Sequence, residues 1–196
     1  MAEYYQDDTY RRYPGFRLLA RDSSKLRLPA SRDIRDVFGT INTTNGKDNN
    51  VIGKHAHGLA SVCYDVLNRI VIDSQLGEAH AYEVDLAVRH LPATQANDLL
   101  LLDRGYASYR WLATCVQQQR HFVVRCSAGS FKPARQMLTG LGADSRVVDL
   151  TSSLGQRLSL ARLGLPSVLR VRFVRVVLPN GEFEVLVTNL LDEKLF

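Results

Sequence analysis

The apolar pattern of the chain is most distinctive at residues 99–102, where four leucines follow one another. Such a run has no amphipathic period and is typical of a strand that is buried on both faces of a sheet. Asp103 follows the run directly, and Gly105 then favours a sharp turn. Enzymes built on sheets commonly place their chemistry at the carboxyl end of a buried strand. Asp103 is therefore a candidate catalytic residue, and the alternative is that it only caps the helix that follows.

Further apolar runs predict strands upstream of this segment. Residues 16–20 and 25–28 are expected to form a pair of strands, with Asp22 between them as a turn residue or a strand-end carboxylate. Residues 59–68 and 69–76 predict an antiparallel hairpin. In the expected fold, this first part of the chain supplies a meander of three antiparallel strands to the sheet.

Before the hairpin, residues 31–38 favour a short helix behind a serine N-cap, whereas residues 40–50 are polar and Asn-rich and predict a loop. After the hairpin, helices and strands are expected to alternate. The spacing of apolar residues predicts helices over 83–91 and 108–119, and a buried strand over 121–126. Three strands followed by alternating helices and strands are the order of an RNase H-like mixed sheet, an α/β fold.

That fold brings the carboxyl end of the first strand beside that of the fourth. Asp22 and Asp103 would then be neighbours, although 103 − 22 = 81 positions separate them. Two carboxylates that converge on one sheet edge suit a divalent-metal site.

A β-rich block is expected after residue 127. Its predicted elements are a helix at 134–138, strands at 146–150, 157–163, 168–178 and 183–190, and a hairpin turn at 179–182. We interpret this block as an insertion into the α/β domain.

Composition and charge narrow the class of protein. The 196 residues are 45% hydrophobic and 23% charged, and the net charge of +5 favours an anionic partner, most commonly nucleic acid. Three cysteines without metal-type spacing suit a reducing compartment, and no apolar signal sequence or membrane span is found. We expect a cytoplasmic protein that acts on DNA, without a membrane or a small-molecule cofactor as partner.

Four stretches of the chain resemble the IS4-type DDE transposases of bacterial insertion sequences. They are residues 17–29, 60–68, 101–109 and 183–192, and they run in the order of that family. The Asp-Arg-Gly-Tyr element after an aliphatic strand is the most specific of them. The resemblance implies an RNase H-like catalytic core with a β-strand insertion, which cuts DNA at transposon ends and joins the 3′-hydroxyl to target DNA.

The resemblance also assigns roles to individual residues. It makes Asp22 the first and Asp103 the second carboxylate of a catalytic triad that binds Mg²⁺ (or Mn²⁺). These ions prefer oxygen ligands such as carboxylates. We expect Arg104 and Arg125 to contact DNA phosphates, although a salt-bridged structural role is open for Arg104. A homodimer is a further expected partner.

The sequence departs from the family at its end. The third carboxylate should lie on a helix within a Tyr-x2-Arg-x3-Glu-x6-Lys pattern, which is absent before the chain stops at Phe196, and Glu193 lacks the required partners. We therefore expect a truncated reading frame or an isolated domain with little strand-transfer activity. Its expected parts are a lead-in over 1–15, part of the catalytic core over 16–126, the insertion over 127–190 and the start of a connection over 191–196.

Two other functions remain open. A catalytically inactive remnant would bind DNA or a full-length transposase through its basic surface. A different RNase H-like nuclease would complete its metal site with Asp65, Asp73 or Glu78.

Overall fold

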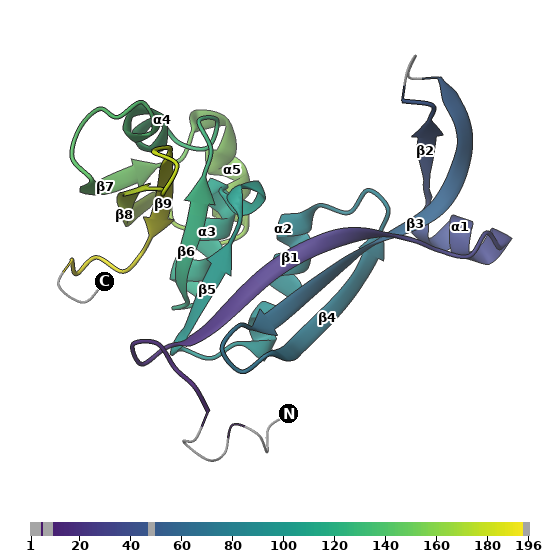
Figure 1. Ribbon diagram of the computed structural model, residues 1–196, viewed down its shortest axis with the longest axis horizontal. Coiled ribbons are helices and arrows are strands. Elements are labelled where there is room, and N and C mark those ends of the chain that lie inside the picture. The colour runs from purple at the N-terminus through teal and green to yellow at the C-terminus, as the bar shows by residue number, and fades with distance from the viewer. Residues whose placement is uncertain (1–4, 6–9, 47–49, 194–196) are drawn as a thin grey trace. The chain divides into compact units, whose positions relative to one another are not determined.

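The computed structural model describes residue 5 and residues 10–46 and 50–193, which form two compact units (Figure 1). The first unit comprises Met1–Ala20, Asp65–Ile70 and Thr94–Phe196, and the second comprises Arg21–Tyr64 and Val71–Ala93. Strand β1 begins in the first unit and continues into the second.

Both units contain strands and helices, as the apolar pattern predicts. The strands among the described residues are β1 (Arg17–Arg27), β2 (Thr40–Thr44), β3 (Val51–Asp65), β4 (Ile70–Glu78), β5 (Asp98–Leu102), β6 (His121–Cys126), β7 (Ser145–Thr151), β8 (Val168–Val177) and β9 (Phe183–Thr188). The helices are α1 (Arg32–Phe38), α2 (Glu83–Arg89), α3 (Tyr109–Gln117), α4 (Lys132–Leu138) and α5 (Leu154–Arg162), with 3₁₀ turns η2 (Leu91–Ala93) and η3 (Arg104–Tyr106). The predicted α/β class is confirmed.

The sheet of the first unit runs in the order β1–β5–β6–β9–β8–β7. Strands β5 and β6 are parallel, with Leu99 opposite His121, whereas β9 pairs with β6 and with β8 in antiparallel fashion. Helix α3 packs against β6 and β8, and α4 packs against β8 and β9. The predicted insertion strands therefore continue the sheet that contains the leucine run.

Three of the four leucines in the run are buried, as predicted. Leu100 is fully buried, Leu99 and Leu102 are nearly so, and Leu101 is half-buried. Trp111 and Leu112 of α3 are also fully buried, and Ser108 caps the helix by accepting a hydrogen bond from the Trp111 N–H (3.4 Å). Burial of these large side chains fixes β5 in the interior and brings its carboxyl end to a defined edge.

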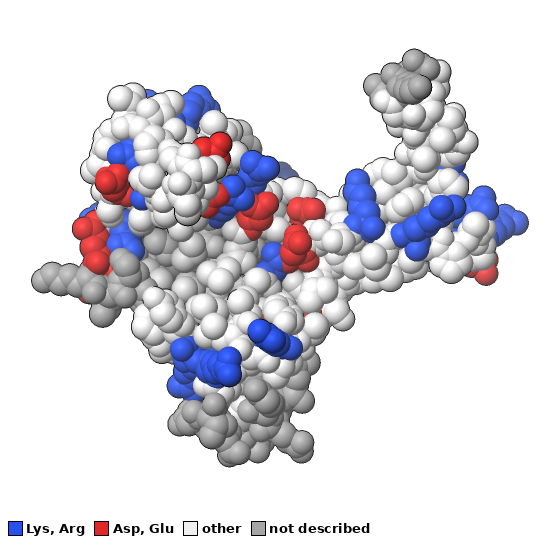
Figure 2. Space-filling model, viewed as in Figure 1, with Lys and Arg blue, Asp and Glu red and all other residues white. Residues whose placement is uncertain are grey.

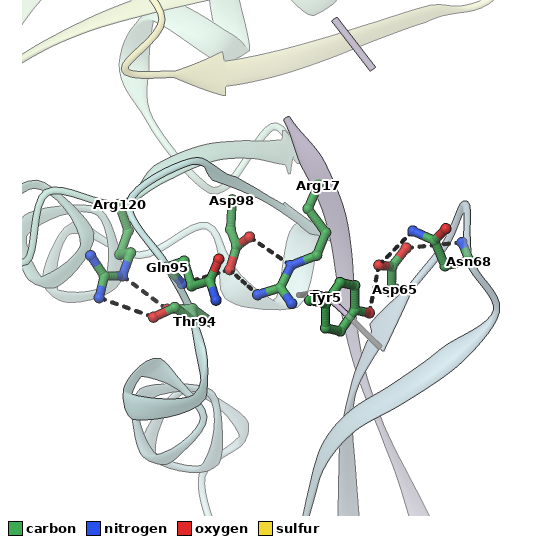
Figure 3. Close-up of polar contacts among 8 residues, drawn as sticks. All are labelled: Tyr5, Arg17, Asp65, Asn68, Thr94, Gln95, Asp98 and Arg120. Carbon is green, nitrogen blue, oxygen red and sulfur yellow. Dashed lines mark hydrogen bonds and ion pairs between the residues drawn. The ribbon is translucent and has the colours of Figure 1, made fainter. Parts of the chain in front are cut away.

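A buried ion pair anchors the other end of β5 (Figure 3). Arg17 donates two hydrogen bonds to Asp98, from Nε (2.8 Å) and Nη2 (2.7 Å), and the Arg17 guanidinium also lies over the Tyr5 ring. The Tyr5 hydroxyl in turn donates to Asp65 (2.8 Å). Breaking such a buried pair by removing one partner costs about 3–5 kcal/mol, so Asp98 is a structural residue.

The second unit has strand order β2–β3–β1, with β4 paired to β3, so the predicted β3–β4 hairpin is confirmed. Helix α2 buries Val84, Leu86 and Ala87. No helix among the described residues has the length and apolar content that crossing a bilayer requires.

Three local predictions are wrong. Residues 16–28 contain one continuous strand and no turn, so Asp22 lies inside β1, because the polar residues after position 21 occupy a largely exposed stretch of the strand. Residues 40–44 form strand β2, paired with β3, instead of a loop; their Thr-rich composition suits an exposed strand, while 47–49 lie outside the described residues. Residues 157–163 are mostly helical, because Ser153 and Gln156 form a capping box that starts α5.

Candidate active site at the end of strand β5

Asp103 occupies the position that the leucine run predicts. Asp103 directly follows β5 and has an extended backbone (φ −76°, ψ 173°). It is the residue before the 3₁₀ turn η3, and its side chain makes no capping hydrogen bond to that turn. The Asp103 side chain is 56% exposed. Asp103 therefore occupies the N-cap position of η3 without a side-chain capping hydrogen bond, and its side chain is largely open to solvent.

Arg125 lies beside Asp103. Its Nη1 is 3.7 Å from Asp103 Oδ1, and its Nη2 forms a closer ion pair with Glu184 of β9. Both pairs are partly exposed, and such pairs contribute little to stability, typically about 0–1 kcal/mol. The structure thus brings together Asp103, Arg125 and Glu184 as one small charged cluster.

Glu184 is the member of this cluster that the sequence did not indicate. It approaches Arg125 because β9 pairs with β6 in antiparallel register, with Leu186 opposite Arg125 and Val185 opposite Cys126. Strand register between segments so distant in sequence leaves no local signal, so no pattern could have identified Glu184.

Arg104 lies in the 3₁₀ turn η3 next to Asp103 and is exposed. Within the described part of the chain it takes part in no ion pair, and therefore the salt-bridged role left open by the sequence is not observed there. An exposed guanidinium beside Asp103 can bind a phosphate with two parallel hydrogen bonds.

Asp22 is exposed on β1, within the second unit. Its Oδ1 accepts a hydrogen bond from the Ser23 N–H (2.8 Å), which leaves its other oxygen open to solvent. Asp22 and Asp103 belong to different units, and their pairing stays a prediction.

Of the other carboxylates that were considered, Asp65 and Asp73 have structural partners, whereas Glu78 is exposed at the end of β4. Asp65 is fully buried and accepts hydrogen bonds from Tyr5 and from the Asn68 side chain (2.8 Å). Asp73 accepts from Gln75 (2.9 Å) and bonds His90 (2.7 Å). Both oxygens of Asp65 are thus engaged, whereas the two side-chain hydrogen bonds of Asp73 share one oxygen, Oδ2.

The donor chemistry at Asp103 fits a hard cation. Its carboxylate is exposed and is opposed only by a loose contact with Arg125. Within the described residues, however, no three His, Cys, Asp or Glu side chains cluster closely enough to hold a metal ion. On the face drawn in Figure 2, Lys and Arg side chains form several separate groups with Asp and Glu side chains between them.

Asp103 lies at the carboxyl end of a buried strand, where open α/β sheets commonly bind their ligands. The model of the transposase DDE domain family matches residues 14–160, more than half of the chain, and the chain belongs to that family. No curated protein matches the sequence.

The fold is also similar to that of a solved transposase. A cryo-EM structure of the piggyBac transposase synaptic complex with hairpin DNA aligns with a TM-score of 0.51 and 10% sequence identity. The alignment covers 90% of this chain and 34% of that transposase, so the chain spans about a third of its length. This likeness confirms the predicted RNase H-like architecture.

Proposed function

We propose that this chain is a DDE transposase catalytic domain that acts in DNA transposition by metal-dependent phosphodiester cleavage and strand transfer. The observation that carries the proposal is Asp103, an exposed carboxylate held at the carboxyl end of a buried strand in a chain of the transposase DDE family. Membership of that family supports the reaction class.

In this proposal Asp22 and Asp103 hold a divalent ion, Mg²⁺ or Mn²⁺, by their exposed carboxylates. Such an ion, when bound, polarises the scissile phosphate and lowers the pKa of the attacking water or 3′-hydroxyl. Arg104 and Arg125 then orient the DNA strand by contacts with its phosphates, and Glu184 fixes the Arg125 side chain.

The finer assignment is to the IS4-type transposases, and it rests on the four stretches of resemblance. The proposed partner is DNA, both at the transposon end and at the target site. A second copy of the chain is a further proposed partner. The solved transposase with a similar fold is a synaptic complex with hairpin DNA, which supports DNA as the partner here.

One observation favours a second function. The described residues contain no cluster of three potential metal ligands around Asp103. A catalytically inactive form would bind DNA or full-length transposase through basic residues, with no dependence on divalent ions.

A plasmid-nicking assay separates the two functions. The chain is incubated with supercoiled DNA in Mg²⁺ or Mn²⁺, beside Asp103→Asn and the control Asp36→Asn, which alters another exposed carboxylate, on α1. We expect metal-dependent nicking that Asp103→Asn reduces to background and Asp36→Asn leaves intact, because an amide is a poor ligand for a hard cation.

Equal nicking by Asp103→Asn and the unaltered chain would rule out the catalytic role of Asp103. Absence of nicking by all three proteins, together with salt-sensitive DNA binding that persists in EDTA, would establish the inactive binding function instead.

A further inference from the structure

A polar cavity of about 670 Å³ lies within the first unit, apart from the Asp103–Arg125–Glu184 cluster. Its walls come from four segments: the start of α3, the loop after β6 with the start of α4, strand β7 and the start of α5. Its polar lining includes Ser108, Ser130, Lys132, Arg146, Thr151 and Gln156. Four chain segments between residues 107 and 156 thus build one recess.

Two cationic side chains line this cavity without internal partners. Lys132 begins α4 and Arg146 lies on β7, and neither is buried. Neither makes an ion pair or hydrogen bond through its side chain within the described part of the chain. Asp149, which also lines the cavity, is paired with Arg170 at 3.3 Å. The cavity therefore has an uncompensated positive charge.

The cavity's other polar groups suit an anion that carries several acceptor oxygens. Hydroxyl and amide side chains of Ser130 and Gln156 can donate hydrogen bonds, and the Gly129 position brings backbone close to the recess. A phosphodiester presents only acceptors, so it matches a lining of two cations and neutral donors.

The cavity also lies at the catalytic end of the sheet. Ala107 and Ser108 follow the η3 turn after Asp103, and the loop with Gly129 follows β6, whose carboxyl end is beside that of β5. A strand of nucleic acid whose phosphate occupies the cavity would continue past the same sheet edge.

We infer that this cavity binds a backbone phosphodiester of a DNA strand, with Lys132 and Arg146 contacting its phosphate. The inference rests on the proposed action on DNA, and it adds a binding site beyond the metal-ligand carboxylates and the arginines next to them. It needs no divalent ion.

Salt-dependent DNA binding in EDTA tests the site separately from cleavage. Anisotropy of a short fluorescein-labelled duplex is followed over about 0.05–0.2 M salt for the chain, Lys132→Ala, Arg146→Ala and the double variant. Arg162→Ala, an exposed arginine of α5 outside the cavity, is the matched control, and thermal melting checks that each variant folds.

Each cavity variant should bind DNA about tenfold more weakly, since hydrogen bonds between charged groups are lost. The slope of log K against log salt should fall by about one for each residue removed, and Arg162→Ala should leave it unchanged. Charge-retaining Lys132→Arg should keep the slope.

Equal slopes for the double variant and Arg162→Ala would overturn the inference. A second outcome would also contradict the inference. Millimolar inorganic phosphate would raise the melting temperature of the unaltered chain but not that of the double variant, and both proteins would bind DNA equally well. The cavity would then bind free phosphate and not DNA. DNA binding is measured in EDTA, and nicking is measured on the unaltered chain. If only the cavity site is wrong, the unaltered chain still nicks DNA, whereas failure of the proposed function abolishes that nicking.

Discussion

At the scale of single residues, strand β5 carries an aspartate at each end, and the two have different environments. Asp98 is fully buried and takes two hydrogen bonds from Arg17. Asp103 is 56% exposed, and its contact with Arg125 is loose at 3.7 Å. Because a buried, fully bonded carboxylate has no oxygen left for a ligand, only Asp103 of these two is available for chemistry.

The sequence predicted Asp103 because four consecutive leucines place a strand before it. It could not predict Glu184 or the burial of Asp98, since both depend on which distant segments meet. Arg17 reaches Asp98 across 81 positions, and Glu184 meets Arg125 only through the register of β9 on β6.

A buried histidine in the second unit makes stability depend on pH. His90 is fully buried, with Nδ1 2.7 Å from Asp73 and Nε2 3.0 Å from the Ser61 hydroxyl. Burial lowers the pKa of His90, the hydrogen bond with Asp73 opposes this, and the nearby charge of Arg21 lowers the pKa further. The net pKa lies below the ordinary 6.5, so the unfolded chain takes up this proton first as pH falls.

The free energy of unfolding should therefore decrease as pH falls below about 6.5, and stay level with respect to this group above it. Urea unfolding at about pH 7.5 and 5.5 measures the change. The substitution His90→Gln should reduce this pH-dependent change in the free energy of unfolding. The substitution His80→Gln, at an exposed histidine, should leave the change as it is. Burial also lowers the pKa of His121, so the stability of the His90→Gln variant should still depend on pH, but less strongly. An unaltered pH dependence in His90→Gln would contradict this account.

At the scale of secondary-structure elements, strong apolar patterns predicted the structure and weak ones did not. Strand β5 and helix α3 are buried elements, and their patterns located them within a residue or two. Helix α5 is mostly exposed, and the alternation of Leu158 and Leu160 with polar residues therefore resembled a strand. An element that buries one residue has no periodic signal to read.

The helical conformation of α5 predicts opposite consequences for its two leucines. A strand would place Leu158 and Leu160 on one face, but in the helix Leu160 is 3% exposed and Leu158 is 75% exposed. Leu160→Ala should destabilise the protein by about 2–5 kcal/mol, and Leu158→Ala by no more than about 0.5 kcal/mol. Chemical denaturation measures both, and similar losses for the two variants would refute the helical assignment.

At the scale of the whole molecule, the two proposed metal ligands come from different units. Asp22 lies on the part of β1 in the second unit, and Asp103 follows β5 in the first. The predicted RNase H-like α/β class is confirmed, and it is this fold that motivates the pairing of the two carboxylates. Chain topology is readable from local patterns, whereas the distance between two exposed side chains on separate units is not.

The most direct test of the central claim is Mn²⁺ binding measured by electron paramagnetic resonance. The unaltered chain is compared with Asp22→Asn, Asp103→Asn, the double variant and the control Asp149→Asn. A shared ion predicts that either single substitution removes the same site, that the double variant loses no further site, and that Asp149→Asn binds as the unaltered chain does. Full Mn²⁺ binding by Asp22→Asn would show that the two aspartates do not share an ion.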